Sequence, residues 1–159
     1  MGEIEIRIAT MDDYSEICRL YRQLDEHHAD ILPDVFQRLP DPPRPREVVA
    51  RFIERGNADY ILTIADGRVV GFLNLSLSSH PPYPMFRGHE FAAVENVVVD
   101  TEYRGKGIGT SLIKAAKAWA KEHGLRFMQT TVWSANKGAR ALYVNQGFEP
   151  LTERLELHL

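Results

Sequence analysis

The residues from 91 to 124 constrain the fold more than any other stretch of this chain. The β-branched run "FAAVENVVV" predicts a strand over 91–99. A helix is predicted over 107–123, ended by Gly124, because apolar residues recur there at helical spacing: Ile108, Leu112, Ala115, Ala116 and Trp119. Three alternating glycines stand between the two elements, at 105, 107 and 109. Glycine allows close backbone approach, and a helix N-terminus offers unpaired N–H groups, so the turn favours a bound anion, most often a phosphate.

Known phosphate-binding patterns narrow the choice. A Walker loop needs Gly-Lys followed by Ser or Thr, but Gly107 follows Lys106. A dinucleotide fingerprint needs G-x-G-x-x-G directly after its strand, whereas here "DTEYR" intervenes and the spacing is G-x-G-x-G. The remaining alternative is a loop whose glycines serve only turn geometry. The flanking Arg104 and Lys106 favour an anion site over that alternative.

The rest of the chain predicts alternating elements of a single domain spanning residues 1–159. The expected strands are 3–9, 59–65, 69–77, 91–99, 126–133 and 151–159, and the expected helices are 12–28, 46–56, 107–123 and one that starts at Ser134 and ends at Gly147. A turn at "DGR" joins 59–65 and 69–77 as a hairpin. One helix connects 91–99 to 126–133, which makes these strands parallel neighbours. The predicted class is therefore α/β, with a mixed sheet and helices on both faces.

Composition and charge exclude several functions. The net charge of −3 argues against general nucleic-acid binding, and no apolar run is long enough to cross a membrane. The N-terminus lacks a signal-peptide pattern, and the single Cys18 fits a reducing compartment, so we expect a cytoplasmic protein. Charge is uneven: residues 102–140 carry +6 and residues 25–41 carry −4. This asymmetry either reflects solvated helix faces or places an anionic cofactor opposite a cationic substrate.

A family resemblance follows from two motifs. Arg104-Gly105-Lys106-Gly107-Ile108-Gly109 resembles the Q/R-x-x-G-x-G/A acyl-coenzyme A signature of the GNAT acetyltransferase superfamily, and "VWSANKGARALYVNQGF" resembles its second signature. The similarity covers roughly residues 60–148. It implies a GNAT-like fold, with a sheet of six to seven strands splayed between its two parallel strands. A β-bulge near Glu95-Asn96 would suit that splay.

The resemblance also implies an N-acetyltransferase that uses acetyl-coenzyme A and no metal. The acceptor would be a primary amine on a small molecule or a peptide, attacked directly within a ternary complex. A second hypothesis is an acyl-coenzyme A binding module without catalysis, and a third is a nucleotide-binding protein. The variable segments 25–41 and 79–90 would flank the acceptor, and the chain could act alone or as a homodimer.

The resemblance assigns the cofactor site residue by residue. Backbone amides from Arg104 to Thr110 would hold the pyrophosphate, with the pantetheine arm along strand 91–99 and against Asn136. The full expected set is Val97, Val98, Val99, Arg104, Gly105, Lys106, Gly107, Ile108, Gly109, Thr110, Asn136 and Tyr143. Asn136 and Tyr143 are seven residues apart and so lie on one face of a helix.

The chemistry needs a base for the ammonium, a donor to the oxyanion and a proton for the departing thiolate. Glu95 is the candidate base, or else a solvated or ion-paired strand residue. Tyr143 is the candidate acid, or else an aromatic residue that only packs. Cys18 is expected to be an inert core cysteine. His27 and His28 are expected at the surface or lining a cleft without metal, and His80 and His89 in a solvated loop.

Overall fold

A computed structural model describes residues 2–159 as a five-stranded sheet packed between helices. The strands lie in the order β1-β2-β3-β4-β5. Their bounds are β1 Ile4–Ile8, β2 Ala58–Ala65, β3 Arg68–Ser79, β4 Glu90–Val99 and β5 Met128–Thr130. The helices are α1 Tyr14–Ile31, α2 Arg46–Glu54, α3 Ile108–Glu122 and α4 Lys137–Asn145. The first four strands pair antiparallel and β4 pairs parallel with β5, so the predicted mixed α/β sheet is confirmed.

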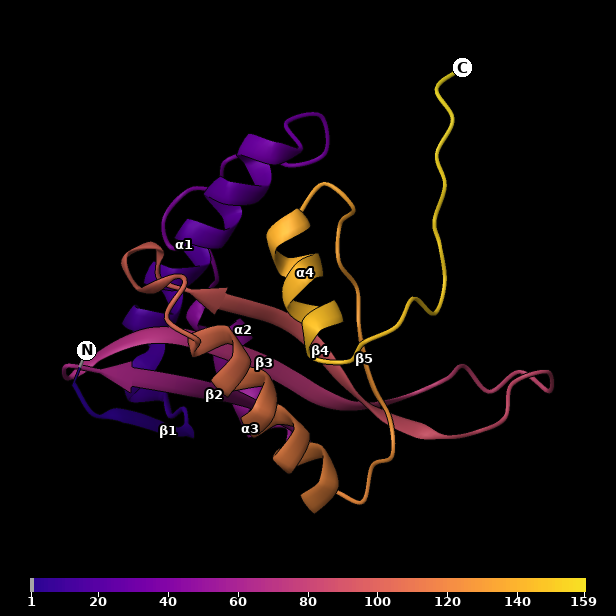
Figure 1. The fold of residues 1–159 in the computed structure, drawn as a ribbon, viewed down its shortest axis with the longest axis horizontal. Helices are drawn as coiled ribbons and strands as arrows, with labels where there is room; N and C mark the ends of the chain where they lie inside the picture. Colours follow the sequence, from indigo (N-terminus) through magenta and orange to yellow (C-terminus); the bar gives the residue numbers. More distant parts are fainter. Residues whose placement is uncertain (1) are drawn as a thin grey trace.

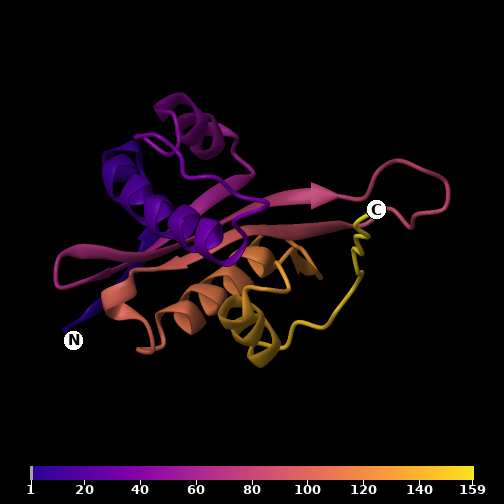
Figure 2. The ribbon, with the colours of Figure 1, turned by 90° about the horizontal axis from the view of Figure 1, so that it is seen from above.

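Helices cover both faces of the sheet, as expected. Figure 2 shows α1 and α2 on one side and α3 and α4 on the other. On the first side, Ile17, Leu20 and Val49 pack against Leu62 and Phe72. On the other side the helix α3 packs through an apolar stripe onto the sheet, with Ile108, Leu112, Ile113, Ala116 and Trp119 all buried. Strand β3 is buried on both faces from Val69 to Ser76; its first half is continuously apolar, whereas its second half alternates leucine with Asn74 and Ser76.

Two positions, one in a turn and one within a strand, show why glycine is needed locally. In the hairpin between β2 and β3, Asp66 and Gly67 both have positive φ (53° and 74°), as the favoured two-residue turn requires. At Gly71, a β-carbon would lie 2.9 Å from the carbonyl oxygen of Val98 and 3.1 Å from Ile108 Cγ2. The lack of a side chain therefore lets α3 approach β3 closely.

A bulge in β4 positions the functional region. Asn74 of β3 faces Asn96, but the next residue, Leu75, faces Val94, so Glu95 is the extra residue of the bulge. The pairing of β4 with β5 ends at Val94 and Thr130. The bulge predicted near Glu95-Asn96 and the splay between the parallel strands are both present.

Three expected element bounds were wrong. Strand β5 has three residues where 126–133 was expected, because the chain leaves β4 after Thr130. The helix α4 begins at Lys137 and not at Ser134, since the Asn136 side chain caps it by accepting from the Ala139 N–H at 3.2 Å. Residues 151–159 form no strand, so the described part of the sheet has five strands and not six or seven.

The C-terminal segment lies apart from the sheet, and Figure 1 shows it running away from α4. Alternation in a sequence indicates which side chains share a face, but a strand also needs a hydrogen-bonded neighbour. The segment 32–45 between α1 and α2 has no regular helix or strand, in agreement with its prolines. Within residues 2–159, no helix combines the length and apolar character that a membrane span requires.

Candidate active site

A cleft of about 710 Å³ opens where β4 and β5 separate. That volume falls within the range of sites for small molecules and cofactors. Five parts of the chain line it: α1 through Leu24 and His27, β4 through Val97–Val99, the glycine loop through residues 103–105 and 107, the first turn of α3, and the segment 135–139 with Leu142. The cleft therefore collects the glycine loop and both sequence signatures around one space.

The first turn of α3 presents unpaired amides to this cleft. Gly107 is the N-cap residue, in the left-handed conformation (φ 81°), and no side chain caps the helix. The first intrahelical bond runs from the Ser111 N–H to the Gly107 carbonyl at 3.0 Å. The amides of Ile108, Gly109 and Thr110 precede that bond, so the helix itself gives them no acceptor. No acidic residue lies in this turn, which leaves its partial positive charge available to an anion.

Ten of the twelve expected cofactor residues line the cleft: Val97, Val98, Val99, Arg104, Gly105, Gly107, Ile108, Gly109, Thr110 and Asn136. Lys106 does not line it, and its ammonium lies 4.7 Å from the centre of the Tyr103 ring in a cation–π contact. Arg104 donates from Nε to the Val99 carbonyl at 3.3 Å, which holds its side chain near the end of β4.

Tyr143, the twelfth residue, is buried rather than exposed to the cleft. It is 6% exposed, its ring packs edge-on against Phe148, and its neighbour Leu142 lines the cleft instead. Burial raises the pKa of the Tyr143 hydroxyl, partly opposed by Thr130. Thr130 in turn donates to the Val94 carbonyl at 3.1 Å. The Tyr143 hydroxyl therefore stays protonated at neutral pH and lies beside the point where β4 and β5 separate.

Glu95 protrudes from the bulge toward the α1 and α2 side of the sheet. Its carboxylate accepts from Asn74 Nδ2 at 3.3 Å, and Asn74 is itself held by Asn96 Nδ2 at 3.0 Å. Loss of hydration raises the pKa of Glu95, against the opposing charge of Arg55 and the hydrogen bonds from Asn74 and Ser76. The charge of Glu95 also contributes to the raised pKa of the Tyr60 hydroxyl. The pKa of this carboxylate is thus raised above the ordinary value of a glutamate, although the residue as a whole is exposed.

Glu95 and Tyr143 lie on opposite sides of β4. Tyr143 belongs to the core that α3 covers, whereas Glu95 influences the tyrosines under α1. A group placed between them would occupy the gap that opens beyond Val94 and Thr130. Neither residue lines the cleft as the structure stands, and their catalytic roles stay predictions.

The other candidates from the sequence lie mostly where they were expected. Cys18 is buried, with Sγ 3.7 Å from the Arg44 carbonyl, as expected of a core cysteine. His27 lines the cleft, while His28 stacks on Phe36 and burial lowers its pKa. His80 and His89 contact each other in the loop before β4. Across residues 2–159, no three His, Cys, Asp or Glu side chains are grouped as metal ligands would be.

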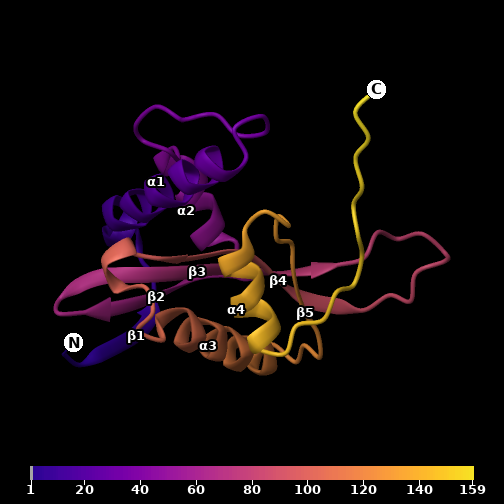
Figure 3. The same ribbon diagram turned by 45° about the horizontal axis from the view of Figure 1, so that its top comes forward.

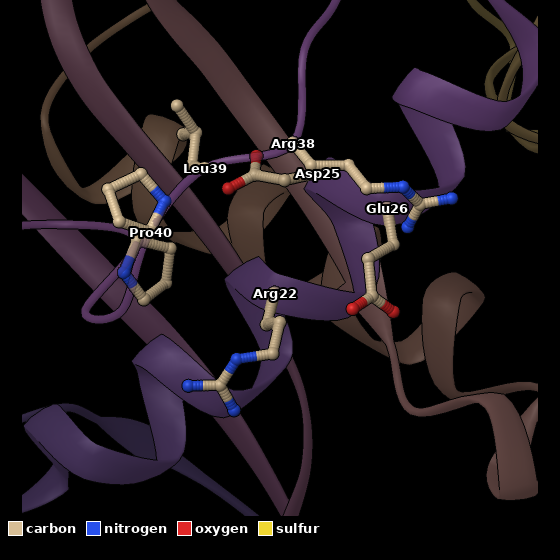
Figure 4. Close-up of a pocket in the computed structure, with 7 residues that line it drawn as sticks. Arg22, Asp25, Glu26, Arg38, Leu39 and Pro40 are labelled. Atoms are coloured by element: carbon tan, nitrogen blue, oxygen red, sulfur yellow. The ribbon is translucent and has the colours of Figure 1, made fainter.

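The acidic segment 25–41 is partly neutralised within the protein. Asp25 pairs with Arg44 at 2.8 Å, Asp30 pairs with Arg38, and Asp41 pairs with Arg22. A small pocket of about 170 Å³ lies among these side chains (Figure 4), well below the usual size of a ligand site. The net charge of −4 therefore overstates the attraction that this segment offers to a cation.

Sequence reasoning missed part of the lining. Leu24, Tyr103, Ala135, Gly138 and Leu142 line the cleft but were not assigned to it. Ala135, Gly138 and Leu142 lie in the second signature, so a closer reading of that motif would have found them. Leu24 comes from α1, and nothing local in the sequence indicates that this helix reaches the glycine loop.

Comparisons with known proteins agree with this geometry. Residues 18–148 match the acetyltransferase (GNAT) family. An uncharacterized N-acetyltransferase of Methanocaldococcus jannaschii is 32% identical over 97 residues, which is 61% of this chain and 42% of that protein. This chain thus spans less than half the length of that curated relative.

Solved structures show the same fold. A tetramutant of the BH1408 protein from Bacillus halodurans superposes with a TM-score of 0.91 at 23% identity, covering 98% of this chain and 99% of that one. An aminoglycoside N-acetyltransferase in complex with CoA superposes with a TM-score of 0.74 at 20% identity, covering 99% of this chain and 94% of that one. Since the family match covers most of the chain and the splayed strands and glycine loop accompany it, the protein belongs to the GNAT acetyltransferase family.

Proposed function

We propose that this protein transfers an acetyl group from acetyl-coenzyme A to a primary amine of a small molecule or peptide, by direct attack in a ternary complex. One observation carries the proposal: the cleft between β4 and β5 runs to the uncapped first turn of α3. Acetyl-coenzyme A has an extended arm, which fits along β4, and a diphosphate, which fits at the first turn of α3. The single buried Cys18 fits activity in a reducing cytoplasm.

In this proposal the diphosphate is held by the backbone amides of Ile108, Gly109 and Thr110, with Arg104 adding positive charge. The pantetheine arm lies along Val97–Val99, where the departure of β5 leaves one side of β4 without a neighbour. Asn136 faces the arm from the start of α4 and can donate from its amide nitrogen. The thioester then lies near Thr130 and Val94, between Glu95 and Tyr143.

The reaction proceeds by proton and acyl transfer without a covalent enzyme intermediate. Glu95, directly or through a water molecule, takes a proton from the ammonium, and the amine nitrogen attacks the thioester carbon. A backbone N–H near Val97 donates to the oxyanion. The carbon–sulfur bond then breaks, and Tyr143 gives its proton to the thiolate. The nitrogen loses its second proton to the Tyr143 oxygen, and Glu95 releases the first proton to solvent. The products are the acetylated amine and coenzyme A.

A thiol-release assay tests the proposal. Purified protein with acetyl-coenzyme A is screened against amines, polyamines, aminoglycosides, amino acids and peptide N-termini. We expect saturable release of thiol with at least one amine and a matching acetylated product by mass spectrometry. Tight binding of acetyl-coenzyme A without release across the whole panel would favour the alternative, a non-catalytic binding module. No binding at all would refute both.

A further inference from the structure

A buried asparagine stands in the middle of the sheet. Asn74 lies on β3, which Figure 3 shows between β2 and β4, with α1 and α2 on one side of the sheet and α3 on the other. The side chain of Asn74 is 1% exposed. Its neighbours Leu73 and Leu75 belong to the core under α3, so the Asn74 amide points to the face that α1 and α2 cover. A buried amide costs free energy unless it is hydrogen-bonded, and this position therefore needs polar partners.

The bulge in β4 supplies both partners. Val94 and Val97 pack into the core under α3, so the two residues between them share the opposite face. These residues are Glu95 and Asn96, whereas in a regular strand two successive side chains point to opposite faces. Asn96 Nδ2 donates to Asn74 Oδ1 at 3.0 Å, and Asn74 Nδ2 donates to Glu95 Oε2 at 3.3 Å. The bulge thus brings the candidate base and a second amide onto one buried side chain.

These two contacts fix the orientation of the Asn74 amide. An ionised carboxylate only accepts hydrogen bonds, so Asn74 must turn its amide nitrogen toward Glu95. The amide oxygen of Asn74 then faces Asn96, which donates to it. Asn74 and Asn96 are also direct partners in the pairing of β3 with β4, so the backbone of the sheet holds the two amides together. The donor that faces Glu95 is therefore set by the sheet and not by a mobile surface side chain.

Three groups oppose the loss of hydration at the Glu95 carboxylate. The charge of Arg55, which follows α2, and the hydrogen bonds from Asn74 and Ser76 all lower the pKa of Glu95. Arg55 is exposed, so salt screens its charge. Asn74 is buried, and a hydrogen bond to the charged form of a carboxylate favours that form. Asn74 is thus the buried group that both orients the carboxylate and keeps it able to accept a proton.

The other ionisable groups on this face are neutral or paired. The hydroxyls of Tyr21 on α1 and Tyr60 on β2 lie 2.9 Å apart, and burial raises the pKa of both, so neither is charged at neutral pH. Arg44 lies 4.2 Å from the centre of the Tyr21 ring and pairs with Asp25. A change at Asn74 should therefore appear in the titration of Glu95 with little contribution from these groups.

We propose that Asn74 is a positioning residue for Glu95: held in place by Asn96, it fixes the direction of the Glu95 carboxylate and stabilises its charged form. This role rests on the proposed function, in which Glu95 takes a proton from the ammonium of the acceptor. Asn74 keeps both of its own amide protons throughout. It does not line the cleft, so it influences acetyl transfer through Glu95 and not through the coenzyme.

Titration of the Glu95 carboxyl by ¹³C NMR tests this role in the free protein, with Glu95→Gln identifying the signal. Asn74→Ala removes the donor, so the pKa of Glu95 should rise by about one unit, the lower end of what a hydrogen bond to a charged group contributes. Asn74→Asp keeps the shape and can still accept from Asn96, but it places a second carboxyl beside Glu95. The upper value of this coupled pair should rise further.

Thr63→Val is the matched control. Thr63 is another fully buried polar residue of the sheet, but it lies on β2 between Ile61 and Ala65, which belong to the core under α3. Its replacement should leave the titration of Glu95 unchanged. A pKa of Glu95 that is the same in the wild-type protein, Asn74→Ala and Asn74→Asp would overturn the proposal.

The pH profile of acetyl transfer gives a second readout. A raised pKa makes Glu95 a base only at higher pH, so Asn74→Ala should lower turnover about tenfold on the acidic side of the profile and approach the wild-type rate at high pH. Affinity for acetyl-coenzyme A should not change. In a Glu95→Gln background the same substitution should have no further effect on the profile. A uniform loss at every pH, present also in that background, would show a structural role only and would contradict the proposal.

The two readouts distinguish a failure of this role from a failure of the proposed function. If the wild-type protein released no thiol with any amine, the proposed function would fail, and the NMR titration would still decide whether Asn74 controls the ionisation of Glu95. If the wild-type protein turned over and Glu95 titrated alike with and without Asn74, acetyl transfer would stand and the role of Asn74 would be wrong.

Discussion

Replacement of Gly107 by alanine separates backbone strain from ligand binding. Gly107 has φ 81° and lines the cleft, and a β-carbon built there meets no atom within 4 Å. Gly107→Ala therefore fits the folded protein sterically but places a methyl group at the N-cap of α3. Gly56→Ala is the matched control, because Gly56 has φ 73°, also has no atom within 4 Å of a built β-carbon, and follows α2 away from the cleft.

The expected magnitudes differ between folding and binding. A left-handed conformation costs a residue with a β-carbon roughly 1–2 kcal/mol, so both variants should lose about that much stability. Only Gly107→Ala should also disturb the amides at the start of α3. Loss of one hydrogen bond to a charged group costs roughly 1.5–3 kcal/mol, which is about a ten- to hundredfold weaker affinity.

Urea unfolding and calorimetric titration with acetyl-coenzyme A measure the two effects. We expect similar losses of unfolding free energy in both variants, and weakened binding in Gly107→Ala alone. Gly109 is a poorer position for this test, since a β-carbon there would meet Leu142 Cδ2 at 2.9 Å and disturb the packing of α4 on α3. Unchanged affinity in Gly107→Ala would refute the placement of the diphosphate at this turn.

Three further predictions follow from the site and its support. Tyr143→Phe removes a hydroxyl only, so acetyl-coenzyme A should still bind while single-turnover acetyl transfer slows by roughly ten- to a thousandfold; an unchanged rate would mean that Tyr143 only packs. Glu95→Gln should lower turnover at neutral pH and recover partly at high pH, where the amine is already deprotonated; a wild-type pH profile would place the base elsewhere. Asp100 is buried and pairs with Arg19, at 2.5 Å, and with Arg68. Burial alone would raise the pKa of Asp100, but these two partners and the hydrogen bond from the Glu102 amide lower it. Asp100→Asn should therefore cost roughly 3–5 kcal/mol of unfolding free energy at neutral pH. A lowered carboxyl pKa stabilises the fold above its unfolded value of about 3.9, so this difference should shrink as the pH falls below that value; a constant difference in urea unfolding would contradict it.

Much of the fold was predictable because its elements are defined locally. Each strand of the antiparallel part of the sheet is predicted by alternation or by β-branched residues. The helix α3 and its buried face are predicted by the periodicity of Ile108, Leu112, Ala116 and Trp119. The conformation of the glycine loop was predictable, since glycine readily adopts the positive φ found at Gly105 and Gly107, and its role as an anion site stays a prediction. The bulge at Glu95 followed from the family resemblance and is present.

The rest depends on contacts between distant residues. The Arg19–Asp100 ion pair ties α1 to the end of β4, yet neither residue carries a local signal of the other. The early end of β5 depends on where the chain leaves β4. Residues 151–159 form no strand because no neighbouring strand pairs with them, and the alternation in their sequence does not reveal this. Likewise, Tyr143 was expected to face the cleft from the spacing on α4, but the packing of its ring against Phe148 buries it.

Hydrogen exchange with and without acetyl-coenzyme A tests the central claim most directly. If the coenzyme lies in the cleft between β4 and β5, its addition should slow amide exchange in the glycine loop, the first turn of α3 and residues 97–99, with smaller protection at 135–139. The loop 80–89 and the helix α2 do not line the cleft and should exchange at unchanged rates. Protection confined to other parts of the chain, with 97–99 and 104–110 unaffected, would contradict the account.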